Sequence, residues 1–262
     1  MLFLLWVLLL TFSSFSLVNR FFRQDEPAEK LLHLLVIFYG LLLVSFTLLG
    51  CFHWLKPLWI TLSFFVFSLL SGLTGRLSLK KNDGPALRLV GQIAIAFTVC
   101  VFLMVVDFQS FLPPLTTDGL LYHLPFAAHY LQTASLSYPP LFFHDIAMTY
   151  YPHGGDLLYA FSLFSQNEHL LRFTQLPMVV IASLALYQLM KNQGFSRETS
   201  ILGACLFSLV RPVAGQTFSC FVDLMLTAWF FSVVYYFSTG QGRKVCLGLV
   251  AAGLLISTKN FA

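Results

Sequence analysis

The sequence predicts an all-α, polytopic transmembrane helical bundle with about eight spans and one long external loop that contains a juxtamembrane amphipathic helix. Of the 262 residues, 58% are hydrophobic and only 10% are charged, whereas a soluble domain is typically about half apolar and a quarter charged. Several apolar runs approach the roughly 20 residues that a helix needs to cross a bilayer. The period-two alternation typical of a membrane β-barrel is absent, and an open sheet would leave backbone groups without partners in lipid. Helices are therefore expected.

The apolar runs predict eight spans, which are Leu2–Val18, Leu31–Phe52, Leu58–Gly75, Leu89–Val106, Leu170–Met190, Ser200–Gly215, Phe221–Phe237 and Val245–Ser257. They divide the chain into a four-span segment over residues 1–107, an external loop over 108–169 and a second four-span segment over 170–262. Because the chain stops directly after the last span, we expect the second segment to be truncated.

Basic residues between the spans predict which side each loop faces. They are Arg20, Arg23 and Lys30, then Arg76, Lys80, Lys81 and Arg88, then Lys191 and Arg197, and finally Arg243 and Lys244. Cytoplasmic loops are enriched in Lys and Arg, and eight spans alternate without conflict if all four groups are cytoplasmic. The net charge of +4 therefore reflects orientation and does not indicate a nucleic-acid partner. With no eukaryotic retention tail visible, we expect a multi-pass protein of the bacterial inner membrane.

The stretch Asp107–Asp156 differs from the rest of the chain because it has no Lys or Arg. It contains Asp107, Asp118, Asp145, Asp156, His123, His129, His144 and His153. A plain connection is usually about 4–6 residues long, and the aromatic and leucine content of this stretch argues against disorder. We interpret it as a functional external loop.

A helical pattern runs through this loop from Asp118 to about Ala134. One stripe of the expected helix is polar and comprises Asp118, Tyr122, His129 and Gln132. The opposite stripe is apolar and comprises Leu120, Leu124, Ala127 and Leu131. Such a helix is expected to lie on the membrane surface with its apolar side down. Leu157–Ser165 is too short to span and is expected to form a second juxtamembrane helix outside, with a half-span as the alternative.

Asp118 is the first candidate for chemistry, because it lies at the junction between loop and helix. A carboxylate there would act as a general base towards an acceptor hydroxyl or would hold a cation. The alternative is a helix cap, a position that Asp favours. The histidines and acids of the loop suggest a metal site or a phosphate-facing pocket, with Asp118 and His123 as metal candidates. No pair has a specific metal-ligand spacing, so interfacial polar residues are the alternative.

Two further groups of residues are candidates for a functional site. In the Tyr150–Asp156 stretch, the glycine pair permits an unusual turn or close approach to a ligand, and an interfacial turn is the alternative. Arg211, Asp223 and Lys259 lie at predicted outer span ends, where charges are costly. Together they would surround an anionic lipid headgroup, with mutual ion pairing as the alternative.

Four segments occur in a recognisable order: DGLLYHLPFAAHYLQ from Asp118, YPHGGDLL from Tyr151, FVDLML from Phe221 and GLLISTKN from Gly253. This order resembles the N-terminal half of the GT-C class of membrane glycosyltransferases, which includes protein mannosyltransferases and bacterial aminoarabinose and lipopolysaccharide-core transferases. The resemblance covers roughly residues 90–262, and its D-x-x-x-Y-H-x-P element is the most specific part.

The resemblance implies a polyprenyl-phosphate-linked sugar as donor, a glycan, lipid or protein as acceptor, and chemistry at the external face. It implies that Asp118 is the catalytic carboxylate and that Tyr122, His123, His129, His153, Asp156, Arg211, Asp223 and Lys259 contribute to substrate binding. Many relatives have two acidic residues at the catalytic position, whereas Thr117 and Gly119 flank Asp118 here, so a divalent metal is not a certain cofactor. A transporter or flippase of a lipid-linked substrate, or a non-catalytic membrane subunit, is the alternative.

Overall fold

The computed structural model describes residues 2–74, 89–110, 116–138 and 150–259. Within these ranges the chain forms helices joined by turns and contains no strand, which confirms the predicted all-α class for this part of the protein. Outside the described residues lie the predicted basic group Arg76, Lys80, Lys81 and Arg88 and the loop residues His144 and Asp145. Asp107 lies within a described helix.

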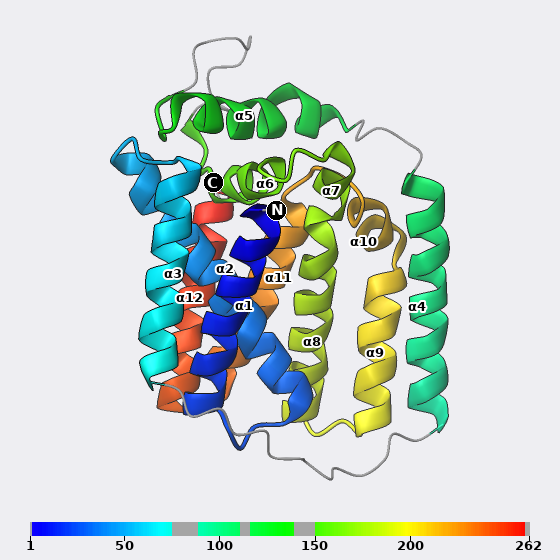
Figure 1. Ribbon diagram of the computed structural model, residues 1–262. Helices are drawn as coiled ribbons and strands as arrows, with labels where there is room; N and C mark the ends of the chain where they lie inside the picture. The colour runs from blue at the N-terminus through cyan, green and yellow to red at the C-terminus, as the bar shows by residue number, and fades with distance from the viewer. Residues whose placement is uncertain (1, 75–88, 111–115, 139–149, 260–262) are drawn as a thin grey trace.

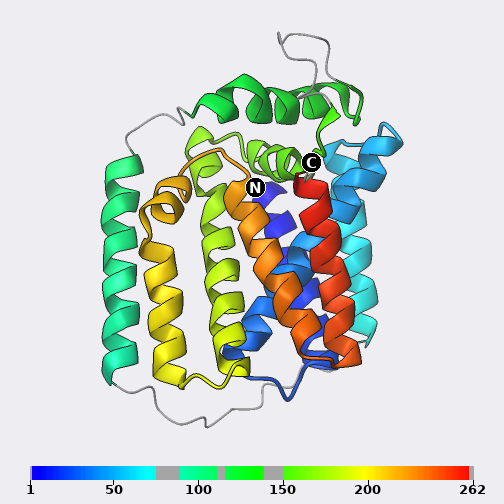
Figure 2. The same ribbon diagram turned by 180° about the vertical axis from the view of Figure 1, so that it is seen from behind.

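Helices form at all eight positions where the apolar runs predict them. They are α1 (Leu2–Phe21), α2 (Pro27–Cys51), α3 (Pro57–Thr74), α4 (Leu89–Ser110), α8 (Leu176–Asn192), α9 (Arg197–Leu209), α11 (Asp223–Ser238) and α12 (Gly242–Thr258). They stand side by side as an upright bundle (Figures 1 and 2). Three described helices are long and apolar enough to cross a membrane, namely Leu2–Phe21, Pro27–Cys51 and Leu170–Asn192. Two shorter apolar helices cover Pro57–Leu73 and Gly91–Val101.

Shorter helices gather at one end of this bundle. They are the π-helix η1 (Gly119–His123), α5 (Leu124–Thr133), α6 (Gly154–Leu163), α7 (Glu168–Arg172), the 3-10 helix η3 (Phe173–Gln175) and α10 (Arg211–Gln216). In both views α5 lies across the end of the bundle, with α6 between it and the upright helices (Figures 1 and 2). The segment rich in Asp and His therefore covers one end of the molecule.

The described basic loops lie at the opposite end. The turns between α1 and α2, between α8 and α9 and between α11 and α12 all face away from α5 (Figure 1). These turns and the helix ends beside them carry Arg20, Arg23, Lys30, Lys191, Arg197, Arg243 and Lys244. The separation of basic loops from the Asp/His segment, which the sequence predicts, is present in the described residues.

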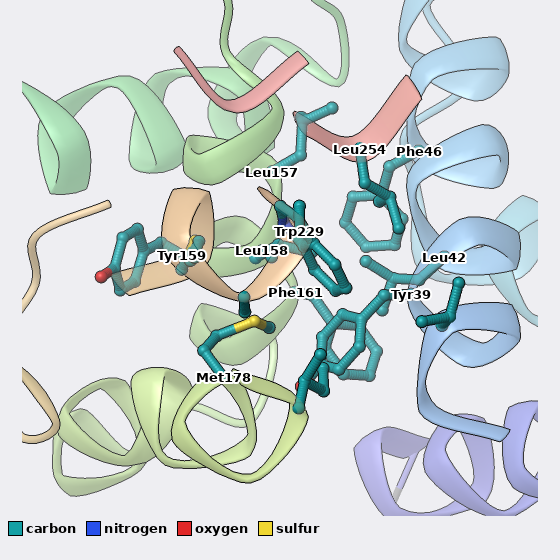
Figure 3. Packing of buried hydrophobic residues seen from close by; sticks show 14 of the residues in the cluster. Tyr39, Leu42, Phe46, Leu157, Leu158, Tyr159, Phe161, Met178, Trp229 and Leu254 are labelled. Carbon is teal, nitrogen blue, oxygen red and sulfur yellow. The ribbon is translucent and has the colours of Figure 1, made fainter. Parts of the chain in front are cut away.

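The stretch Leu157–Ser165, predicted as a juxtamembrane helix, contributes most of helix α6, which is buried. It begins at Gly154, and its residues from Gly154 to Ser162 are buried. Leu157, Leu158 and Phe161 project into the core (Figure 3), where the Phe161 ring lies 6.0 Å from that of Phe46 on α2. α5 packs against α6 and supplies the cover that makes this burial complete.

The buried face of the η1–α5 segment also differs from the predicted apolar stripe. Leu120 is 49% exposed, whereas Gly119, His123, Phe126, Ala127 and Tyr130 are buried. The cause is a π-turn, in which the Leu124 N–H donates to the Gly119 carbonyl five residues earlier. The wider turn shifts the angular phase of the helix, so Leu120 lies outside the inner face, whereas Leu124, Ala127 and Leu131 of the predicted stripe pack in or against the core.

The predicted span Ser200–Gly215 is interrupted. α9 ends at Leu209, Val210 is extended with φ −59° and ψ 130°, and α10 starts at Arg211. Pro212 explains the break, because proline lacks an N–H and its ring clashes with the carbonyl one turn earlier. α9 has 13 residues, which at about 1.5 Å per residue is roughly 20 Å and shorter than the hydrocarbon core of a bilayer.

Candidate functional site

Asp156 joins the two layers that cover the α5 end of the bundle. Its two carboxylate oxygens bind different histidines: Oδ1 lies 2.6 Å from Nδ1 of His123, and Oδ2 lies 2.9 Å from Nδ1 of His153. Asp156 and His123 are buried, with 4% and 6% of their surfaces exposed. A carboxylate only accepts hydrogen bonds, so both imidazoles donate to Asp156 from Nδ1.

Two glycines bring this group against the neighbouring helices. A Cβ on Gly154 would lie 2.7 Å from the backbone oxygen of Ser257, near the end of α12. A Cβ on Gly155 would lie 2.6 Å from Cγ1 of Val222, directly before α11. The pair therefore permits close helix packing, since a side chain at either position would clash. The unusual turn that the sequence allows is not formed, because both glycines lie in the first turn of α6.

Close packing at Gly119 places Asp118 beside the segment that precedes α11. A Cβ on Gly119 would lie 2.6 Å from Cβ of Cys220, which precedes α11 by three residues. The Asp118 side chain forms no capping hydrogen bond with η1. The helix-cap alternative for Asp118 is therefore not observed, and its carboxylate is available for other contacts.

Tyr122 connects Asp118 to the other carboxylates. Burial is the largest cause that raises the pKa of Tyr122, followed by the charge of Asp118, which also accepts a hydrogen bond from the hydroxyl. The charges of Asp156 and Asp223 raise the pKa further. Three carboxylates thus act on one hydroxyl, which stays protonated near neutral pH and serves as a donor.

Lys259 provides a cation at this end of the bundle. Its Nζ lies 2.9 Å from Oδ1 of Asp223, and the two side chains are 48% and 45% exposed. Such an exposed pair contributes about 1 kcal/mol of stability at most. The interaction therefore matters little for folding and leaves both groups accessible to a polar ligand.

A buried hydrogen-bond network fixes the chain in front of Asp223. The Tyr159 hydroxyl donates to the carbonyl of Phe221 at 2.6 Å, and Nε2 of Gln175 donates to the Tyr159 hydroxyl at 2.9 Å. Gln175 also donates to the Phe221 carbonyl. Neither residue is recognised as a candidate from the sequence alone. Gln175 is, however, a polar residue within a predicted span, and such residues usually have a structural or functional role.

Cys220 is not suited to nucleophilic chemistry. Burial raises the pKa of its thiol to about 11, and the opposing effect of the Arg172 charge is smaller. The thiolate is the reactive form of cysteine, so little of it exists at neutral pH. Cys220 serves as a small packing residue under Gly119.

Two predicted site residues are not brought into this group. Nε2 of His129 lies 3.2 Å from Oγ of Ser137, and this bond stays within the segment around α5. Arg211 opens α10, which lies away from the C-terminal end of α12 in both views (Figures 1 and 2). Of the two predicted cations, Lys259 pairs with Asp223 and Arg211 lies elsewhere.

One described group of at least three side chains has a geometry that could hold a metal ion. It consists of Asp25, Glu29 and His33, whose ligand atoms lie within 4.8 Å of one another. These residues belong to the α1–α2 turn and the start of α2, at the end opposite α5. The pair Asp118 and His123, which the sequence suggests for a metal, is not part of such a group among the described residues.

The described chain is therefore an all-helical, strongly apolar protein with a group of carboxylates, histidines and one lysine at the end opposite its described basic loops. Comparison with protein-family models, with curated proteins and with solved structures found no match.

Proposed function

We propose that the protein is a GT-C-like membrane glycosyltransferase, or the N-terminal part of one, that uses a polyprenyl-phosphate-linked sugar. In this proposal the bundle crosses the bacterial inner membrane eight times, with α9 and α10 together forming one broken span, the basic loops are cytoplasmic and the α5 end faces outward. The observation that carries the proposal is the set of charges acting on Tyr122. Asp118 and Asp223, which lie 105 positions apart in the sequence, both affect its pKa, and Asp223 holds Lys259.

The proposed reaction is a direct displacement. Asp118 accepts the proton of an acceptor hydroxyl while the hydroxyl oxygen attacks the anomeric carbon of the donor sugar. The bond between this carbon and the phosphate oxygen breaks, and polyprenyl phosphate leaves with the electron pair. Lys259 stabilises the negative charge of the phosphate, and the Tyr122 hydroxyl, which donates to Asp118, accepts a hydrogen bond from a sugar hydroxyl.

The Asp156 group supports this assignment in a different way. By binding His123 at the end of η1 and His153 before α6, it fixes the turn that carries Asp118. Preorganised groups stabilise a transition state better than mobile ones. Asp118, Asp156 and Asp223 lie beside or at the start of η1, α6 and α11, at the α5 end of the bundle and not halfway along it, which favours an enzyme over a transporter with a binding site near the midplane.

Replacement of Asp118 by asparagine tests the proposal, because it removes the base and keeps the shape. Membranes that contain the protein are incubated with undecaprenyl phosphate carrying radiolabelled mannose, glucose or aminoarabinose, and the transfer of label out of the lipid phase is measured. We expect wild-type transfer from at least one donor and a loss of about a hundredfold or more in Asp118→Asn. The control Glu198→Gln, which lies at the start of α9 at the basic end, should keep the wild-type rate.

An undiminished rate in Asp118→Asn would remove Asp118 from the mechanism. Movement of the labelled lipid across the membrane without sugar transfer would instead support a transporter or flippase. Neither activity, together with stable complex formation, would support a non-catalytic subunit.

A further inference from the structure

A deep apolar groove lies between α4, α8 and α9, away from the Asp118 group. Its volume is about 520 Å³. The three helices stand next to one another in both views, with α9 between α4 and α8 (Figures 1 and 2). Leu176 and Ser208 line the groove towards the α5 end, while Tyr187 and Arg197 line it at the basic end. The groove thus follows the long axis of the bundle, and among the described residues that line it the one cation, Arg197, lies at the basic end.

The length of the groove matches one half of a bilayer. Its wall on α8 extends from Leu176 to Tyr187, which corresponds to about 17 Å at 1.5 Å per residue. The hydrocarbon core of a bilayer is about 30 Å thick, so each leaflet contributes about 15 Å. A single extended acyl chain of the leaflet next to the basic end therefore has the right length.

The basic end of the groove favours an anion. α9 begins with Arg197, and α2 begins next to the lining residue Ala28. The N-terminus of a helix carries a partial positive charge that attracts anions, and the first turns of α9 and α2 each contribute a residue to the lining, Arg197 and Ala28. Each first turn also contains a carboxylate, Glu198 in α9 and Glu29 in α2, and neither of these side chains lines the groove. The nearby carboxylate of Glu26 is neutralised, because its Oε2 lies 2.6 Å from Nζ of Lys191.

We propose that this groove holds one acyl chain of an anionic phospholipid from the leaflet at the basic end, with the phosphate beside Arg197. The apolar walls bind the chain, and the cation with the two helix termini selects the charged headgroup. The inference uses the membrane orientation of the proposed function but does not depend on glycosyl transfer. A protein that transfers no sugar would still retain this lipid.

The test is native mass spectrometry of the purified full chain after incubation with equal amounts of phosphatidylglycerol and phosphatidylcholine. We expect the wild type to retain one phosphatidylglycerol in preference to phosphatidylcholine. Arg197→Gln should reduce this preference about fivefold. The control Arg243→Gln removes a cation from the same end that does not line the groove, and it should keep the wild-type preference.

A second pair of variants tests the groove itself. Cys205→Phe places a ring in the groove and should abolish retention of both lipids, whereas Cys246→Phe, on the exposed side of α12, should not. If Cys205→Phe fails to fold, Val180→Phe fills the groove from α8 and replaces it. Equal losses in Arg197→Gln and Arg243→Gln, full retention in the filled variant, or a bound mass that matches polyprenyl phosphate or a second copy of the chain would each overturn the proposal.

Discussion

Lys244→Met is expected to destabilise the protein by about 3–5 kcal/mol, the cost of leaving a buried charge without its partner. Nζ of Lys244 lies 2.5 Å from Oε1 of Glu29, and the two side chains are 10% and 9% exposed. The Tyr235 hydroxyl donates to the same carboxylate oxygen. Without the ammonium, the Glu29 carboxylate would lose its ion-pair partner at a buried position that water does not reach.

This ion pair fixes the α11–α12 hairpin to α2 at the basic end. Nδ1 of His33 lies 2.9 Å from the Tyr236 hydroxyl, and its Nε2 lies 3.0 Å from Oδ2 of Asp25. The network therefore joins the α1–α2 turn, α2 and α11 through side chains alone. Loss of one charge should loosen several helices together, which is why we expect a large effect.

The measurement is thermal or denaturant unfolding in detergent, followed by circular dichroism. Arg243→Met is the matched control, because this neighbouring guanidinium is exposed and donates to the Phe21 carbonyl; it should cost less than about 1 kcal/mol. The double variant Glu29→Gln with Lys244→Met removes both charges and should recover much of the loss. Equal effects of Lys244→Met and Arg243→Met would contradict the assignment of a buried pair.

Asp156→Ala is expected to cost about 3 kcal/mol of stability, because it leaves two imidazole N–H groups without their acceptor. The carboxylate accepts both bonds, and His123 is buried. Removal of an acceptor from a buried donor costs more than the bond itself contributes, since the donor does not regain water. Asp156→Asn keeps one acceptor oxygen and should have an intermediate effect.

Asp223→Asn is the control for this prediction. Its carboxylate is 45% exposed and pairs with a lysine that is equally accessible, so the loss should stay below about 1 kcal/mol. The free energy of unfolding of Asp156→Ala and of Asp223→Asn is measured in the same assay. Limited proteolysis detects whether the segment around α5 is released from α6. If Asp156→Ala unfolds with the same midpoint as Asp223→Asn, Asp156 does not hold the two layers together.

The existence of the upright helices could be predicted from the sequence because their signal is local. An apolar run of adequate length contains all the information needed for a helix, whatever its neighbours are. The boundaries and phases were predicted less well, and the reasons are physical. Pro212 divides a run that is apolar on both sides, and the π-turn at Gly119 shifts the inner face of the segment that follows.

The site was predictable in part for the same reason. Asp118, His123, His153 and Asp156 could be named because they share a loop that has no Lys or Arg. The roles of Tyr159 and Gln175 depend on helix packing across 46 to 62 sequence positions, and no local pattern encodes such a contact. The burial of α6 is also a tertiary effect, since it requires α5 as a cover.

The central claim is that the Asp118 group faces outward while the basic loops face the cytoplasm. The most direct test is to measure on which side of the membrane each end of the bundle lies. Two single cysteines are introduced into a cysteine-free variant, Tyr150→Cys near α6 and Gln193→Cys in the α8–α9 turn, both at exposed positions. Intact bacterial cells are treated with a maleimide that cannot cross the membrane. We predict labelling at position 150 in intact cells, and at position 193 only after permeabilisation. Labelling of position 193 alone in intact cells would contradict the account.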